Sequence, residues 1–150
     1  MKKKIIEVSS DTNIGGAGKC LLTLLENFNY DEFEVKTILP KNSLLKPHME
    51  KMGATVIEVD GIADKSLDFG AVSELRKIFK SEKPDLVHTH ASMSARIAAK
   101  QAGVKVIYTR YEVEESSMLP TLAIRSTTVS GTIIGKSKIT SGIHAHHLPS

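Results

Sequence analysis

Short β-branched runs alternate with amphipathic segments along most of this chain, and that alternation is the strongest constraint on its fold. The runs at residues 5–8, 33–39, 55–59, 86–88 and 104–108 are predicted strands. The four segments between them have apolar residues at helical spacing. Strands and helices in this order form βαβ units, whose crossovers build a parallel sheet. We therefore expect an α/β protein with a Rossmann-like, doubly wound parallel sheet in three α/β/α layers.

Two of the predicted helices carry clear N-terminal signals. Asp68 is the expected N-cap of the third helix, and Phe69 is the first of its core-facing residues. Ser92 or Ser94 caps the fourth helix, which is rich in alanine. These signals place the helix starts after the third and fourth predicted strands, the third helix following a loop at residues 60–65.

The regular pattern weakens toward the end of the chain. We assign residues 1–125 to one Rossmann-like domain and residues 126–150 to a weakly specified edge element and tail. Residues 126–129 form the candidate sixth strand. The remaining tail is rich in Ser, Thr, Gly and Ile without a clear period.

Composition excludes several classes of protein. A chain of 150 residues with 41% hydrophobic and 25% charged residues can bury a core without disulfides or metals. A net charge of +3 spread along the chain does not indicate nucleic-acid binding. No apolar run reaches the ~18 residues of a membrane span, and no signal peptide is recognisable. The single cysteine, Cys20, is expected to be a small buried hydrophobe in a cytoplasmic protein.

A glycine-rich loop follows the first predicted strand. Gly15, Gly16 and Gly18 lie at the start of the first helix, where backbone can approach a ligand closely. Free N–H groups and the positive end of the helix dipole favour an anion such as a phosphate there. The alternative is that these glycines only make a tight strand-to-helix turn.

Two common phosphate motifs do not fit this loop. In the P-loop register, Asn13 replaces the first glycine and Cys20 replaces the hydroxyl that binds magnesium. In the dinucleotide register, Leu21 replaces the third glycine, and the second strand ends without a carboxylate. Neither a nucleotide triphosphatase nor a nicotinamide or flavin enzyme is expected.

The chain resembles the N-terminal domain of the family 4-like glycosyltransferases, which have the two-domain GT-B architecture. The resemblance covers roughly residues 3–111. It rests on the order and spacing of four segments: Ile-Gly-Gly-Ala-Gly at 14–18, Ser-Leu-Asp at 66–68, Lys-Pro-Asp-Leu-Val-His-Thr-His at 83–90, and Ala-Gly-Val-Lys-Val-Ile-Tyr-Thr-Arg at 102–110.

The resemblance implies an acceptor-side half whose glycine loop lies near the donor diphosphate. A second Rossmann-like domain in that family binds the nucleotide sugar. The reaction is sugar transfer, usually with retention and without an essential metal, so a nucleotide sugar is the co-substrate and no cofactor is expected. The second GT-B domain is expected to be absent from these 150 residues, which leaves a truncated chain or one part of a two-chain enzyme.

The resemblance and the strand order together suggest a set of substrate-binding residues. Ligands in such sheets bind at the carboxyl ends of strands. Residues following the first, fourth and fifth predicted strands should therefore share one crevice. The set is Gly15, Gly16, Gly18, His90, Ser92, Arg110 and Tyr111.

Two members of this set have open alternatives. Tyr111 stands where the family often has a histidine, and it cannot do a histidine's proton work near neutral pH. No catalytic residue is therefore assigned. Arg110 either binds a phosphate or acidic acceptor, or pairs at the surface with Glu112 or Glu114.

The histidines do not predict a metal site. His88 and His90 point the same way if the strand continues, but no third ligand follows at a recognisable spacing. His90 instead either contacts the acceptor or packs structurally. His144, His146 and His147 are interpreted as an incidental cluster in the tail.

The leading hypothesis is an acceptor-side glycosyltransferase domain, of the hexosyltransferase type if a donor-binding domain completes it. The alternatives are a non-catalytic binding remnant or partner subunit, and an α/β enzyme such as a nucleotide-sugar epimerase. Expected partners are a nucleotide-sugar donor, an acceptor and a second Rossmann-like domain or chain. No nucleic acid or membrane span is expected, although peripheral membrane contact is compatible with the hypothesis.

Overall fold

The computed structural model describes residues 1–63, 67–113 and 122–128, with the backbone alone at 110–113 and 122–128. Its strands and helices alternate as the sequence pattern indicates. The strands are β1 (Lys3–Ser9), β2 (Phe33–Pro40), β3 (Thr55–Val59), β4 (Leu86–His90), β5 (Val106–Val113) and β6 (Leu122–Thr128), and the helices are α1 (Gly16–Glu26), α2 (Lys46–Lys51), α3 (Phe69–Glu82) and α4 (Met93–Gln101).

The strands form one sheet in the order β3-β2-β1-β4-β5-β6. Neighbours from β3 to β5 are parallel, and β6 pairs antiparallel with β5. The chain starts at β1, moves outward to β3 and then returns to β4, so the strand order reverses between β1 and β4. A reversal of this kind opens a crevice at the carboxyl ends of the two strands.

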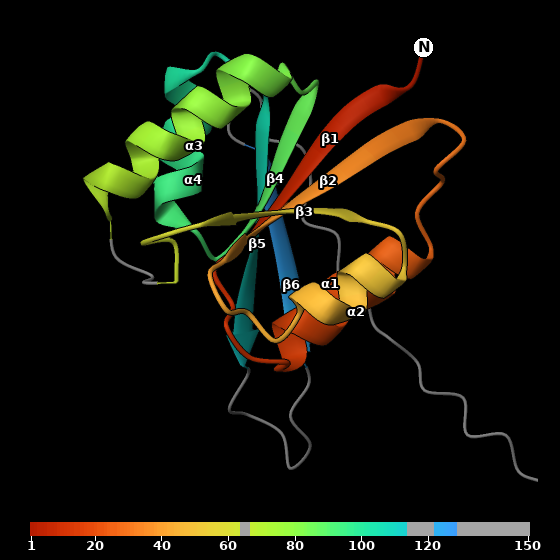
Figure 1. Ribbon diagram of the computed structural model, residues 1–150. Coiled ribbons are helices and arrows are strands. Elements are labelled where there is room, and N and C mark those ends of the chain that lie inside the picture. The colour runs from red at the N-terminus through yellow and green to blue at the C-terminus, as the bar shows by residue number, and fades with distance from the viewer. Residues whose placement is uncertain (64–66, 114–121, 129–150) are drawn as a thin grey trace, which may run out of the picture.

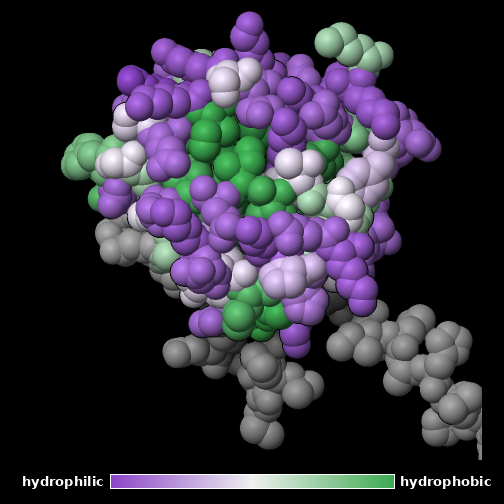
Figure 2. All heavy atoms as spheres, viewed as in Figure 1, coloured by the Kyte–Doolittle hydropathy of each residue, from purple (hydrophilic) through white to green (hydrophobic). Residues whose placement is uncertain are grey.

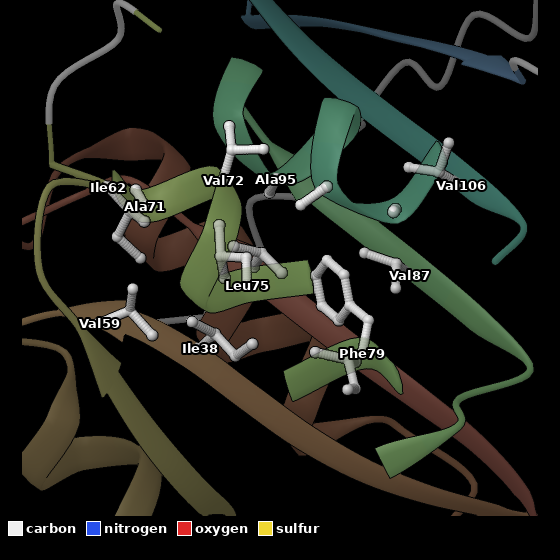
Figure 3. Packing of buried hydrophobic residues seen from close by; sticks show 14 residues of the cluster. Ile38, Val59, Ile62, Ala71, Val72, Leu75, Phe79, Val87, Ala95 and Val106 are labelled. Atoms are coloured by element: carbon white, nitrogen blue, oxygen red, sulfur yellow. The ribbon is translucent and has the colours of Figure 1, made fainter. Parts of the chain in front are cut away.

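Helices cover both faces of the sheet, as Figure 1 shows, with α3 and α4 on one side and α1 and α2 on the other. A hydrophobic cluster fills each interface. Ile38, Leu75, Phe79 and Val87 belong to the cluster beneath α3 and α4 (Figure 3). Leu21 belongs to the one beneath α1 and α2. The expected three-layer, Rossmann-like α/β fold is thereby confirmed.

Helix ends follow the expected capping chemistry. Asp68 is the N-cap of α3, and its Oδ1 accepts a hydrogen bond from Ala71 N at 2.7 Å. Ser92 is the N-cap of α4, and its Oγ accepts from Ala95 N at 3.2 Å. Each cap satisfies an N–H group that the helix itself leaves free.

Two apolar side chains are more exposed than expected. Phe69 is 78% exposed, although it was expected to face the core. It occupies the first turn of α3, and the buried stripe of the helix begins at Ala71 and Val72. Cys20 is only partly buried, because the buried stripe of α1 contains its neighbour Leu21 instead.

The bounds of the last three strands differ from the sequence prediction in ways that affect the site. β4 continues to His90, and β5 runs to Val113 instead of ending at Tyr108. β6 begins at Leu122, four residues before the expected 126, and so crosses the predicted boundary at 125. The extension of β5 is stabilised by its antiparallel pairing with β6, which supplies backbone partners that the local sequence does not reveal.

The edge strand β3 is only half-covered. Its Val56 and Ile57 are partly buried. In the view of Figure 2, hydrophobic side chains lie at the centre of the molecular face and hydrophilic ones surround them.

Among the described residues, no helix is both long and apolar enough to cross a bilayer.

Candidate functional site

The glycine loop lies at the carboxyl end of β1, where the strand order reverses. Gly15 is the N-cap of α1, with φ −90° and ψ −166°, and no side chain caps the helix. A Cβ built on Gly15 or Gly16 would meet no atom within 4 Å, and both residues are exposed. Their backbone N–H groups are therefore open to a ligand, and the first turn contains no acidic residue to repel an anion.

Gly18 has a different role from the two glycines before it. It is buried, and a Cβ there would lie 2.9 Å from Leu45 Cδ2 and 3.3 Å from the carbonyl oxygen of Asn13. The small residue lets α1 pack closely against the chain that leads into α2. Gly18 therefore allows close packing behind the loop and does not line its exposed surface.

Hydrogen bonds from the β2–α2 connection hold the glycine loop in place. Ser43 Oγ donates to the Asp11 carbonyl at 2.8 Å, and Leu44 N donates to the Thr12 carbonyl at 2.9 Å. Ser10 N donates to the His90 carbonyl at 3.4 Å, which joins the carboxyl ends of β1 and β4. The loop thus has a defined position relative to both strands.

His90 is buried at the end of β4, within the strand and not after it. Only 4% of it is exposed, and its Nε2 lies 2.9 Å from Glu7 Oε2. His88, which occupies the register position next to Glu7, has its Nδ1 2.9 Å from the same oxygen. The two imidazole rings lie 4.2 Å apart, centre to centre.

Glu7 is a candidate site residue that the sequence analysis did not single out. It is 2% exposed in the middle of β1. Burial raises the pKa of its carboxyl group, but hydrogen bonds from His88 and His90 outweigh burial, so the pKa is lowered from its ordinary value. The only signal in the sequence was a single carboxylate within an otherwise apolar strand, which is rare in a buried position without a partner.

A third strand contributes to the same cluster through Thr109 of β5. Its Oγ1 lies 2.8 Å from His88 Nε2. The atoms of Glu7, His88 and His90 that could bind a metal all lie within 4.8 Å of one another, as a metal site requires. The structure thus supplies a third candidate ligand, which the spacing in the sequence did not reveal.

Ser92 serves the backbone in this structure. It is 1% exposed, and its hydroxyl caps α4. Ala91, between His90 and Ser92, has φ +59°, an uncommon conformation for a residue with a Cβ. Strained backbone of this kind often occurs at functional sites. A direct contact between Ser92 and substrate stays a prediction.

Arg110 and Tyr111 lie within β5, so their expected position after the strand was wrong. Their backbones pair with Arg125 and Ile124 of β6. Their side chains lie outside the described part of the chain, as do those of Glu112 and Glu114 and all of the tail histidines.

Exposed apolar residues gather on the loops and first helical turns that follow the strands. Ile14 follows β1, Leu44 follows β2, Leu67 and Phe69 follow β3, and Met93 follows β4. All of these segments leave the sheet at the carboxyl edge. We call this set the apolar rim, and it borders the glycine loop.

The sequence matches the model of one protein family, described as Glycosyltransferase Family 4, over residues 14–128. No curated protein matches the sequence. Several solved structures share the fold. MurG of Acinetobacter baumannii aligns with a TM-score of 0.56 and 15% identity, over 69% of this chain and 33% of the MurG chain.

Two further solved structures share the fold but are described as other kinds of enzyme. A putative UDP-N-acetylglucosamine 2-epimerase from Listeria monocytogenes has a TM-score of 0.53 and 18% identity, over 71% of this chain and 30% of the other. Glycinamide ribonucleotide transformylase 1 from Symbiobacterium toebii has a TM-score of 0.60 and 12% identity, over 92% and 73%. The present chain thus spans about a third of the length of MurG and the epimerase.

Proposed function

This chain belongs to glycosyltransferase family 4, and we propose that it forms the acceptor-side half of an enzyme that transfers a sugar from a nucleotide-sugar donor. The donor-binding half would be a second Rossmann-like domain or chain. The family match over residues 14–128 favours this function over the epimerase alternative. The reaction would use a nucleotide sugar as co-substrate and no cofactor, in the cytoplasm.

The open pair Gly15 and Gly16 is the observation that carries the proposal. Neither glycine is required by packing, since a Cβ on either would meet nothing. The two residues are exposed at the start of α1, where helix N–H groups suit the diphosphate leaving group, which gains negative charge as the sugar bond breaks. Glycine is a favoured N-cap residue, which accounts for Gly15, but this preference does not extend to Gly16 in the first helical position.

The apolar rim supports a partner at the same edge. Isolated exposed apolar residues need no explanation, but here each of the first four strands is followed by at least one. A second domain facing this edge would cover part of the rim and close the crevice over the glycine loop. The acceptor would then enter beside the carboxyl end of β4.

The test is a transfer and hydrolysis assay with several nucleotide sugars, with and without a donor-binding partner domain. We expect turnover only when the partner is present. Gly16→Val should lower that turnover about tenfold or more while leaving the melting temperature unchanged, because its side chain enters ligand space only. Thr23→Val, an exposed substitution farther along α1, is the matched control and should have no effect.

Three other results would redirect the proposal. Turnover by the isolated chain would show that no donor-binding partner is needed. Equal turnover in the Gly16→Val and Thr23→Val variants would remove the glycine loop from the donor site. Absence of turnover with every partner and donor would leave a non-catalytic binding subunit.

A further inference from the structure

We propose that Glu7, His88 and His90 bind one divalent metal ion of the zinc class, which links β1 to β4 beneath the glycine loop. Imidazole nitrogens favour zinc, copper, nickel and iron over magnesium and calcium, and one carboxylate completes a two-histidine, one-carboxylate set. The resemblance described above implies a reaction without an essential metal. The role inferred here is structural, and it is independent of the proposed transfer.

The distances suit such an ion. His88 Nδ1 and His90 Nε2 each lie 2.9 Å from Glu7 Oε2. Metal–ligand bonds of about 2.0–2.2 Å in a tetrahedral site place neighbouring donor atoms about 3.3 Å apart. Each Glu7–imidazole distance would therefore open by a few tenths of an ångström on binding an ion. The two imidazole nitrogens already lie within 4.8 Å of each other.

Outer contacts also resemble those of metal sites. When Thr109 Oγ1 accepts a hydrogen bond from His88 Nε2–H, the His88 Nδ1 lone pair is left directed at the centre of the cluster. Ligating histidines commonly hold their second nitrogen in this way. Thr37 of β2 is the register neighbour of Glu7 and shares its face of the sheet. Its buried hydroxyl has no hydrogen-bond partner among the described residues, so it is available to a carboxylate or metal-bound water.

The buried carboxylate of Glu7 favours a cation in this cluster. Glu7 is buried among the strands of the sheet, where an ionised carboxylate is costly unless it is paired or bound to a metal ion. A metal ion would add a full positive charge beside it and join strands whose ligands, Glu7 and His90, are 83 positions apart in the chain. Binding only to the folded state would stabilise it in proportion to metal concentration.

The test uses the full chain with His144→Asn, His146→Asn and His147→Asn, because the tail histidines could bind metal by themselves. After treatment with a chelator, Zn²⁺ is titrated by calorimetry, and Co²⁺ by its visible absorption. We expect one bound equivalent, a four-coordinate cobalt spectrum, and a melting temperature that rises with Zn²⁺. Thr109→Val should weaken binding about tenfold through His88.

Ligand substitutions and a matched control complete the design. Glu7→Gln and His88→Asn should each abolish stoichiometric binding, whereas His48→Asn, at an exposed histidine of α2, should leave it unchanged. Binding that survives both ligand substitutions, or no uptake by the tail-substituted chain, would overturn the proposal.

One measurement does not depend on substituting buried residues. In the tail-substituted chain, ring ¹⁵N resonances of His88 and His90 are followed by NMR as Zn²⁺ is added. We expect His88 Nδ1 and His90 Nε2 to shift in proportion to one bound equivalent. Unchanged resonances at saturating Zn²⁺ would overturn the proposal even if Glu7→Gln and His88→Asn fail to fold.

Discussion

The three glycines between β1 and the first turn of α1 have different surroundings. Gly15 and Gly16 are exposed with no atom near a built Cβ, whereas Gly18 lies against Leu45. The first pair leaves room for something outside the chain, and the third glycine allows one segment of the chain to approach another. The same residue type therefore serves binding at two positions and packing at one.

This difference predicts unequal stability effects for two alanine substitutions. Gly18→Ala would place a Cβ 2.9 Å from Leu45 Cδ2, and overpacking costs about 1–3 kcal/mol. Higher helix propensity offsets at most about 1 kcal/mol. We expect a net loss of about 1 kcal/mol in the free energy of unfolding, measured by urea denaturation. Gly16→Ala should change it by less than about 0.5 kcal/mol. Equal effects would contradict the assigned roles.

The start of α3 is fixed to the start of α4 by side-chain hydrogen bonds. Asp68 caps α3 through Ala71 N, and its own N–H donates to Ser94 Oγ at 3.1 Å. Ser92 caps α4 in the same way. Both helix starts flank the carboxyl edge of the sheet, so the caps help to position the apolar rim.

Asp68→Ala should lower the free energy of unfolding by about 1 kcal/mol, because an N–H of the first turn of α3 loses its acceptor. Asp68→Asn is the control, since asparagine caps a helix about as well as aspartate does. Urea denaturation followed by circular dichroism measures both. Equal destabilisation in the two variants would show that the negative charge, and not the cap, stabilises the helix.

Glu82, the last residue of α3, joins the helix to the sheet. Its Oε2 lies 2.7 Å from Lys36 Nζ of β2 and 3.4 Å from Lys4 Nζ of β1. The Lys36 hydrogen bond is the largest influence on the pKa of Glu82 and, despite opposing desolvation, keeps it below its ordinary value of 4.5. These contacts join α3 to β1 and β2, which are distant from it in sequence, so they stabilise the fold of the whole molecule.

The lowered pKa of Glu82 predicts a pH-dependent contribution to folding. A carboxyl group whose pKa is lower in the folded state stabilises that state above its unfolded pKa and loses the effect as pH falls through the folded value. Glu82→Gln should therefore lower the free energy of unfolding at pH 7 by at most about 1 kcal/mol, since the pair is partly solvated. The difference from the unaltered chain should shrink as the pH falls through the lowered folded-state pKa of Glu82.

Urea denaturation across this pH range measures the effect of Glu82. Glu34→Gln is the matched control, because Glu34 is about half exposed and lies 3.9 Å from Lys4 Nζ. We expect a smaller effect at pH 7 for Glu34→Gln. A difference between Glu82→Gln and the unaltered chain that stays constant with pH would show that charge is not the cause.

Local sequence signals determined the succession of strands and helices along the chain, the parallel sheet, the Asp68 cap and the position of the glycine loop. They could do so because periodicity, capping and turn chemistry act over a few residues. The length of β5 was not predictable in this way, since its second half depends on pairing with β6.

Only the tertiary structure brought Glu7 to His88 and His90 and separated the roles of Gly16 and Gly18. The carboxylate and its imidazole partners come from strands that are neighbours in the sheet but 83 positions apart for Glu7 and His90. No spacing in the sequence records such a contact, because strand order and register arise from packing of the whole chain. The glycine loop was evident from the sequence, whereas the buried cluster beneath it required the fold.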